Sequence, residues 1–219
     1  MNILISLVKK DLYTLGKSAR SLVIFLLIYS AVLLIMGNLS LLPSVATVIC
    51  AMLPLSSFSY DDFAKWNNYA LTMPVSRNLL ALSKYILLLA VVFASSVLSI
   101  LFWVLSHIPI GGTADVISLT ELLASWEAAA VTILLAHSLT FPLVIRHGTE
   151  RGRTVFFTLC LCAALLIVLG EKYLDTGIAA SIDLESALKT FLTVAPFIAA
   201  LILFLSYRVS AAILEKKEF

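Results

Sequence analysis

Six long runs of apolar residues, separated by short polar stretches, dominate this chain. They cover approximately residues 21–38, 41–59, 79–106, 119–144, 154–170 and 187–207. A helix needs about 20 apolar residues to cross a bilayer, and tilt or local thinning of the bilayer accommodates a shorter run. The pattern therefore predicts an all-α polytopic membrane protein with six transmembrane helices, in a single domain that covers residues 1–219.

The basic residues predict the orientation of these spans, because Lys and Arg near span ends stay on the cytoplasmic side. Six spans place 13 of the 15 basic residues on one side of the membrane, and only Lys172 and Lys189 on the other. Splitting or merging one span would scatter the basic residues over both sides. The charge pattern therefore predicts that both termini are cytoplasmic.

Residues 3–17, ahead of the first span, have the pattern of an amphipathic helix. One face holds four apolar residues at helical spacing, Leu4, Val8, Leu12 and Leu15. A helix of this kind lies in the membrane interface and would meet the first span at an elbow. The alternative is a straight cytoplasmic extension of the span, since Gly16 is the only obvious bend signal.

The polar loop between the second and third spans predicts a short cytoplasmic helix over residues 60–73. Ser59 and Asp62 have the spacing of a capping box at its start, and Pro74 ends it. Its apolar face holds Phe63, Trp66, Ala70 and Met73. A helix bracketed by two spans could transmit a displacement from a partner. A surface helix that rests on lipid headgroups would show the same pattern.

A third cytoplasmic element, FPLVIRHGTERGR over residues 141–153, is a predicted loop in which Gly148 and Gly152 allow tight turns. Its charged side chains are Arg146, Glu150, Arg151 and Arg153. A basic loop is often only a topology signal, but this charge density also suits an acidic partner surface or lipid headgroups. The composition does not separate these alternatives.

Composition supports the membrane assignment and excludes several functions. Hydrophobic residues make up 61% of the chain and charged residues 13%, against about 45–50% and 25% in soluble domains. The net charge of +2 is too small and too scattered for nucleic-acid binding. The three cysteines lie in apolar runs without the spacing of a disulfide framework or metal site. A nucleotide-binding motif and hydrolase motifs are missing, so the chain is not expected to be an enzyme or to bind a cofactor.

Four polar residues inside the predicted spans are candidates for a translocation path. They are Glu127, His137, Ser96 and Ser99. Ionisable residues at membrane depth often face a cavity or a partner. Each also has an ordinary explanation: Glu127 as an interfacial carboxylate, His137 as an interhelical hydrogen-bonding group, and the serines as small packing residues.

Two stretches carry a resemblance to a known family: FSYDDFAKWNNYALTMPVSRNLLALSKY and, two spans later, PLVIRHGTERGR. They resemble the compact six-span permeases of bacterial type 2 ATP-binding cassette exporters, in particular the group that exports phenol-soluble modulins. The resemblance implies that 60–73 is a coupling helix that inserts into a separate ATPase subunit. The residues implied in this contact are Asp61, Asp62, Phe63, Trp66, Tyr69, Pro74 and Arg77, with the elbow helix beside them.

The same resemblance implies an exporter in the bacterial cytoplasmic membrane, built from two permeases, identical or homologous, and two ATPase subunits. ATP and Mg would bind the ATPase. Amphipathic or hydrophobic substrates, peptides in the first place, would enter from the membrane or the cytoplasm, with lipids and hydrophobic drugs as alternatives. A non-transporting immunity or sensor protein that binds a toxic peptide in the bilayer is the second functional hypothesis.

Overall fold

The fold is known from a computed structural model, which describes residues 3–36, 42–70, 72–73, 75–106, 118–174 and 184–216. The described residues form helices and no strands, as predicted. In chain order the helices are α1 (Ile3–Met36), α2 (Leu42–Phe63), α3 (Trp66–Ala70), α4 (Arg77–Ser106), α5 (Leu119–His147), α6 (Thr149–Leu174) and α7 (Leu184–Lys216).

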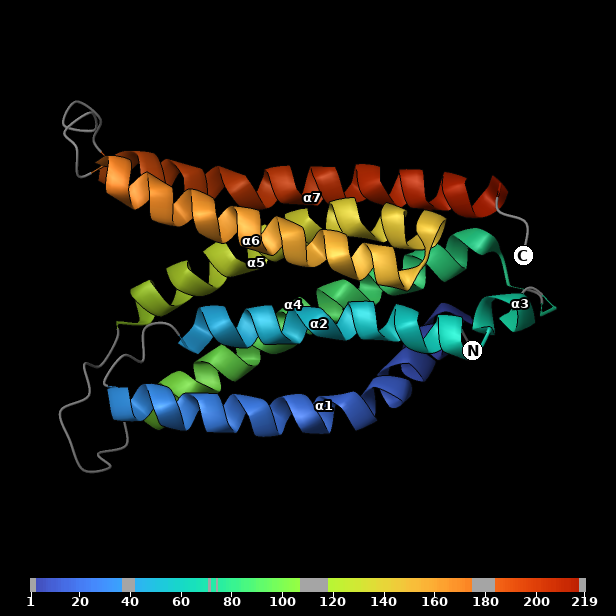
Figure 1. The fold of residues 1–219 in the computed structure, drawn as a ribbon, viewed down its shortest axis with the longest axis horizontal. Coiled ribbons are helices and arrows are strands. Elements are labelled where there is room, and N and C mark those ends of the chain that lie inside the picture. The colour runs from blue at the N-terminus through green and yellow to red at the C-terminus, as the bar shows by residue number, and fades with distance from the viewer. Residues whose placement is uncertain are drawn as a thin grey trace.

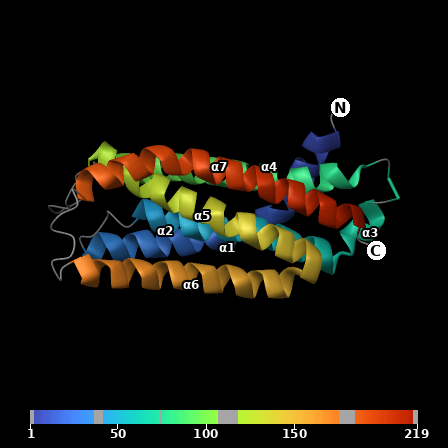
Figure 2. The same ribbon diagram turned by 90° about the horizontal axis from the view of Figure 1, so that it is seen from above.

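The six long helices run along one axis as an elongated bundle, and the short α3 lies at one end (Figure 1). Figure 2 shows the start of α1 and the end of α7 at this same end, which we call the α3 end. Helix α5 packs against α6 and α7, α2 packs against α4, and α1 lies against both α2 and α4. The largest fully buried side chains, Phe141 of α5 and Phe156 of α6, lie where these groups meet.

Three described helices are long and apolar enough to cross a membrane: Arg77–Leu101, Leu119–His147 and Thr193–Lys216. A fourth is added if the two halves of α1 count as one bent span. Helices α2 and α6, of 22 and 26 residues, occupy the positions of the predicted second and fifth spans. The chain is therefore a multi-pass membrane protein, and the count of six spans stays a prediction.

Helix α1 changes direction in its first half. Its segments Ile3–Gly16 and Arg20–Leu33 differ in direction by 58°, a geometry that an elbow would require. Of the predicted apolar face, Leu15 is buried and Leu12 is 51% exposed, while Leu7 and Asp11, which lie outside that face, are buried. Asp11 faces inward because it pairs with a lysine of α4, so a polar residue lies on the packed face.

The predicted continuous helix over 60–73 is interrupted. Helix α2 extends to Phe63, and Lys65 then takes a left-handed conformation with φ of 50° before α3 begins. The predicted capping box is also wrong: the Ser59 hydroxyl donates to the Leu55 carbonyl, as in a helix interior. Because the break turns the chain, Phe63 is exposed while Trp66 is half-buried, so the two do not share an apolar face.

The turn between α5 and α6 is tighter than the loop predicted over 141–153, since both helices extend into it. Gly148 has φ of 89°, a conformation that glycine adopts without steric cost. Gly152 belongs to α6, where a Cβ atom would lie 2.0 Å from Cγ2 of Val144. The prediction of a tight turn is confirmed at Gly148, whereas Gly152 serves the close approach of the two helices.

Candidate functional site

Four charged side chains meet between α1, α2 and α4 at the α3 end of the bundle. They are Lys10 and Asp11 of α1, Asp61 of α2 and Lys84 of α4, and we call them the ion cluster. Two positive and two negative charges make the ion cluster neutral. Buried charges are tolerated in proteins when they are paired in this way.

Lys84 lies at the centre of the ion cluster. Its Nζ atom is 3.0 Å from each carboxylate oxygen of Asp11, 2.7 Å from Oγ of Ser57, and also donates to Asp61. Asp11 is 1% exposed, Asp61 6% and Lys84 7%. Bonds between charged groups are shorter and stronger than those between neutral ones. This one ammonium group therefore joins three helices at a single level.

Lys10 extends the ion cluster to α3. Its Nζ atom is 2.8 Å from Oδ1 of Asp11 and 2.7 Å from Oδ1 of Asp61. The same atom lies 4.4 Å from the centroid of the Trp66 ring, within the range of a cation–π interaction. A cavity of about 40 Å³ adjoins these residues. Helix α3 thus contacts the ion cluster through an aromatic face.

The two predicted acidic contact residues have internal partners. Asp61 belongs to the ion cluster and is buried. Oδ2 of Asp62 accepts a hydrogen bond of 3.3 Å from the backbone N–H of Thr149, the first residue of α6. A carboxylate is favourable there because a helix N-terminus has unpaired N–H groups and a positive dipole end. The two carboxylates therefore fasten α2 to its neighbours.

Arg77, another predicted contact residue, binds the end of α7. Its Nη1 atom donates to the carbonyl oxygens of Leu214 and Glu215, at 3.1 and 2.6 Å, where a helix C-terminus has unpaired acceptors. Pro74 lies outside the described residues. Of the predicted contact residues, Phe63 is 90% exposed and Tyr69 59% exposed.

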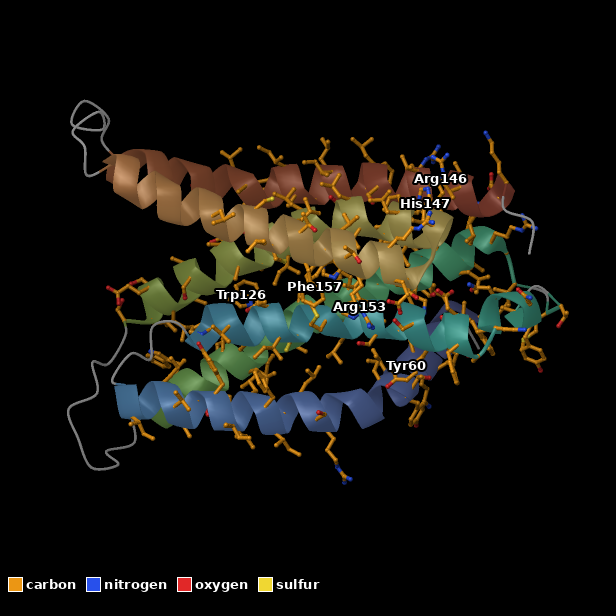
Figure 3. The ribbon with its side chains drawn as sticks, in the orientation of Figure 1. Tyr60, Trp126, Arg146, His147, Arg153 and Phe157 are labelled. Carbon is orange, nitrogen blue, oxygen red and sulfur yellow. The ribbon has the colours of Figure 1, made fainter. Side chains whose placement is uncertain are left out.

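The charged residues of the α5–α6 turn divide into two groups. Nη2 of Arg153 donates a hydrogen bond of 3.0 Å to Oγ of Ser59 on α2. Arg146, Glu150 and Arg151 are exposed. Figure 3 shows Arg146 toward the α3 end. The turn therefore combines one residue that contacts α2 with three that face outward.

The four predicted translocation residues lie in different surroundings. His137 is fully buried, with its ring nitrogens 2.9 Å from the Ile133 carbonyl and 3.1 Å from the Ala51 carbonyl of α2. Ser99 is buried and donates to its own helix, as does the half-buried Ser96. Glu127 is half-buried. Among the described residues, no hydrogen bond joins any two of these four, and His137 bridges two helices.

Sequence reasoning missed two polar contacts. Neither Lys84 nor Asp11 was a predicted site residue, since Lys84 counted only among the basic residues that set the orientation. Their position inside helical runs was the signal that could have identified them. The Tyr85 hydroxyl lies 2.7 and 2.8 Å from Oγ of Ser206 and of Ser210 on α7. The spacing of these serines by four residues places both on one helix face.

These observations define a multi-pass helical membrane protein whose charged contacts gather at the α3 end, where Phe63 and Tyr69 are exposed. Residues 6–215 match the family described as ABC-2 family transporter protein, and the chain belongs to that family. It is thus a non-catalytic permease component that works with an ATPase subunit in an ATP-binding cassette transporter. Among the curated proteins and the solved structures, none matches the chain.

Proposed function

We propose that this permease is half of the membrane part of an exporter, and that its ATPase subunit binds the corner between α2 and α3. In the orientation that the basic residues predict, this corner faces the cytoplasm. ATPase closure would rock two permease subunits, identical or homologous, between inward and outward exposure. The substrates are amphipathic or hydrophobic molecules, with peptides as the first class, in keeping with the sequence resemblance.

One observation carries this proposal: the corner that presents Phe63 and Tyr69 outward is joined inside to the ion cluster. Large exposed aromatic residues among polar neighbours are typical of a protein-binding surface. Phe63 directly follows Asp61 and Asp62, which are bonded to residues of α1, α4 and α6. A force that a partner exerts on the Phe63 ring would therefore reach these three helices.

A displacement of α3 has a second route into the bundle. The Trp66 ring is held over Lys10, which pairs with Asp61. The contacts are electrostatic and short, so α3, α1 and α2 resist separation. Corner and helices should therefore move together when a partner pushes on α3.

The experiment is copurification of the ATPase with the permease in detergent, combined with measurement of ATPase activity. Phe63→Ser with Tyr69→Ser should weaken binding by about ten-fold or more, since large apolar interface residues can contribute over 2 kcal/mol each. Exposed residues are suitable targets because their loss leaves the ion cluster intact. Phe93→Ser, which removes a ring of α4 that is 72% exposed and lies away from the corner, is the matched control.

Equal copurification of the double variant, the control and the unaltered protein would refute binding at this corner. A second experiment separates export from immunity. Cells that carry the permease with a catalytically inactive ATPase should be sensitive to a toxic peptide if the protein exports it. Protection that persists without ATP hydrolysis would instead support a peptide-binding immunity protein.

A further inference from the structure

A groove of about 320 Å³ runs along one face of α6, starting near the α3 end. Its lining residues are Glu150, Arg153, Thr154, Phe157, Thr158 and Leu161. The spacing by three and four residues places them on one helix face. Figure 3 labels Arg153 and Phe157, one helical turn apart, on this helix. The groove is separate from the corner proposed to bind the ATPase.

The groove changes character along its length. Charged groups of both signs, Glu150 and Arg153, lie at its start, and Phe157 and Leu161 follow at 53% and 61% exposure. Arg153 and Leu161 are eight residues apart, which is about 12 Å along a helix. A polar mouth thus lies beside an apolar floor, whose residues belong to the predicted fifth span. Amphiphilic molecules that stand in a bilayer have this same order of groups.

The charges at the mouth are suited to a headgroup with both signs. Glu150 and Arg153 are three residues apart, a spacing that brings side chains on a helix within about 5–6 Å of each other. Among the described residues, no ion pair joins these two side chains. The guanidinium of Arg153 is positioned by Ser59, and its planar fork has further N–H donors for a phosphate. The Glu150 carboxylate can accept a hydrogen bond from an ammonium group.

We propose that the α6 groove binds one phospholipid with a zwitterionic ethanolamine headgroup, in the leaflet at the α3 end. The lipid phosphate bonds to Arg153, its ammonium group bonds to Glu150, and an acyl chain lies on Phe157 and Leu161. Charge complementarity selects this lipid over an anionic one, because an anionic headgroup would leave Glu150 facing negative charge.

Native mass spectrometry of the full chain in detergent tests this site, with phosphatidylethanolamine, phosphatidylglycerol and diacylglycerol as probes. Phosphatidylethanolamine should bind once per chain and more tightly than the other two. Arg153→Gln should weaken it by about ten-fold or more, the loss expected for a hydrogen bond to a charged group. Arg151→Gln, which removes a neighbouring exposed charge outside the groove, should leave its affinity within about two-fold.

Two further variants separate the headgroup contact from the groove itself. Glu150→Gln should weaken the binding of phosphatidylethanolamine by up to about five-fold, as for an exposed ion pair. It should not weaken the binding of phosphatidylglycerol. Thr158→Trp fills the groove without changing its charge and should weaken the binding of every diacyl probe. Because Thr158 is exposed, this variant should fold even if Arg153→Gln does not.

The proposal is overturned if phosphatidylglycerol binds as tightly as phosphatidylethanolamine, or if Arg151→Gln and Arg153→Gln have equal effects. It is also overturned if a second copy of the chain covers the groove. Leu161→Cys, with Cys160 and Cys162 replaced by alanine, tests that occupant in membranes. An efficient disulfide between two chains would assign the groove to a permease dimer, and its failure to form would agree with a lipid.

Discussion

Lys84 offers the most direct test of the ion cluster. Lys84→Met preserves an unbranched side chain of similar length and leaves Asp11 and Asp61 facing a single ammonium group, that of Lys10. Removal of one partner from a buried ion pair costs about 3–5 kcal/mol, because it leaves an uncompensated buried charge. We expect a loss of this size, since Asp11 is 1% exposed and Lys84 contacts both of its oxygens.

The second variant makes this prediction specific to charge. Adding Asp11→Asn to Lys84→Met restores neutrality at the ion cluster, so the double variant should be more stable than Lys84→Met alone. The expected coupling is about 0.5–3 kcal/mol, the range for residues that share an ionic network. If the variants acted only by loss of packing, the destabilisation by Lys84→Met and that by Asp11→Asn would add, and the double variant would be less stable than Lys84→Met alone.

The assay is reversible unfolding in mixed micelles with increasing sodium dodecyl sulfate, followed by circular dichroism. Lys216→Met is the control, because Lys216 is exposed in the last turn of α7 and should contribute less than about 1 kcal/mol. If Lys84→Met is no more destabilising than the control, the ion cluster does not hold these helices together. Strict additivity with Asp11→Asn would refute the electrostatic reasoning.

The remaining predictions concern helix packing and are checked in the same unfolding assay. Gly152→Ala should destabilise the protein by about 1–3 kcal/mol through overpacking, because the added Cβ atom would meet the Val144 side chain. Adding Val144→Ala should restore much of this stability. If it does not, the assigned contact between Gly152 and Val144 is wrong. Tyr85→Phe should cost about 1 kcal/mol, since it removes the hydroxyl between Ser206 and Ser210; an unchanged free energy of unfolding would show that this contact is not stabilising.

The sequence predicted the class of fold because hydrophobicity over 20-residue windows is a strong local signal. It placed a helix at each of the six apolar runs, and the structure has a long helix at every one. The capped start of α5 at Ser118 and Glu121 was not resolved in advance. Boundaries were less accurate, since α2 continues to Phe63, into residues that were predicted to start a separate cytoplasmic helix over 60–73.

The candidate site was harder to predict, because its contacts join residues far apart in the chain. Lys84 is 73 positions from Asp11 and 23 from Asp61, and nothing local shows that these charges meet. Asp61 was expected at a partner surface because the family resemblance implied it in the ATPase contact, whereas it is 6% exposed within the ion cluster. The break at Lys65 was also unexpected, since a lysine in a left-handed conformation has no sequence signature comparable to glycine.

Polar contacts between helices are concentrated toward the α3 end of the bundle. Between helices in lipid, hydrophobic contact gives little directional constraint, so hydrogen bonds and close packing fix their relative positions. At the α3 end the ion cluster joins α1, α2 and α4, and Asp62 and Arg153 add α6. Tyr85, the residue after Lys84, joins α4 to α7 at nearly the same level. Farther along, His137 joins α5 to α2. Most of these bonds between helices therefore lie toward the end that carries α3, which is the end where the proposed ATPase contact would act.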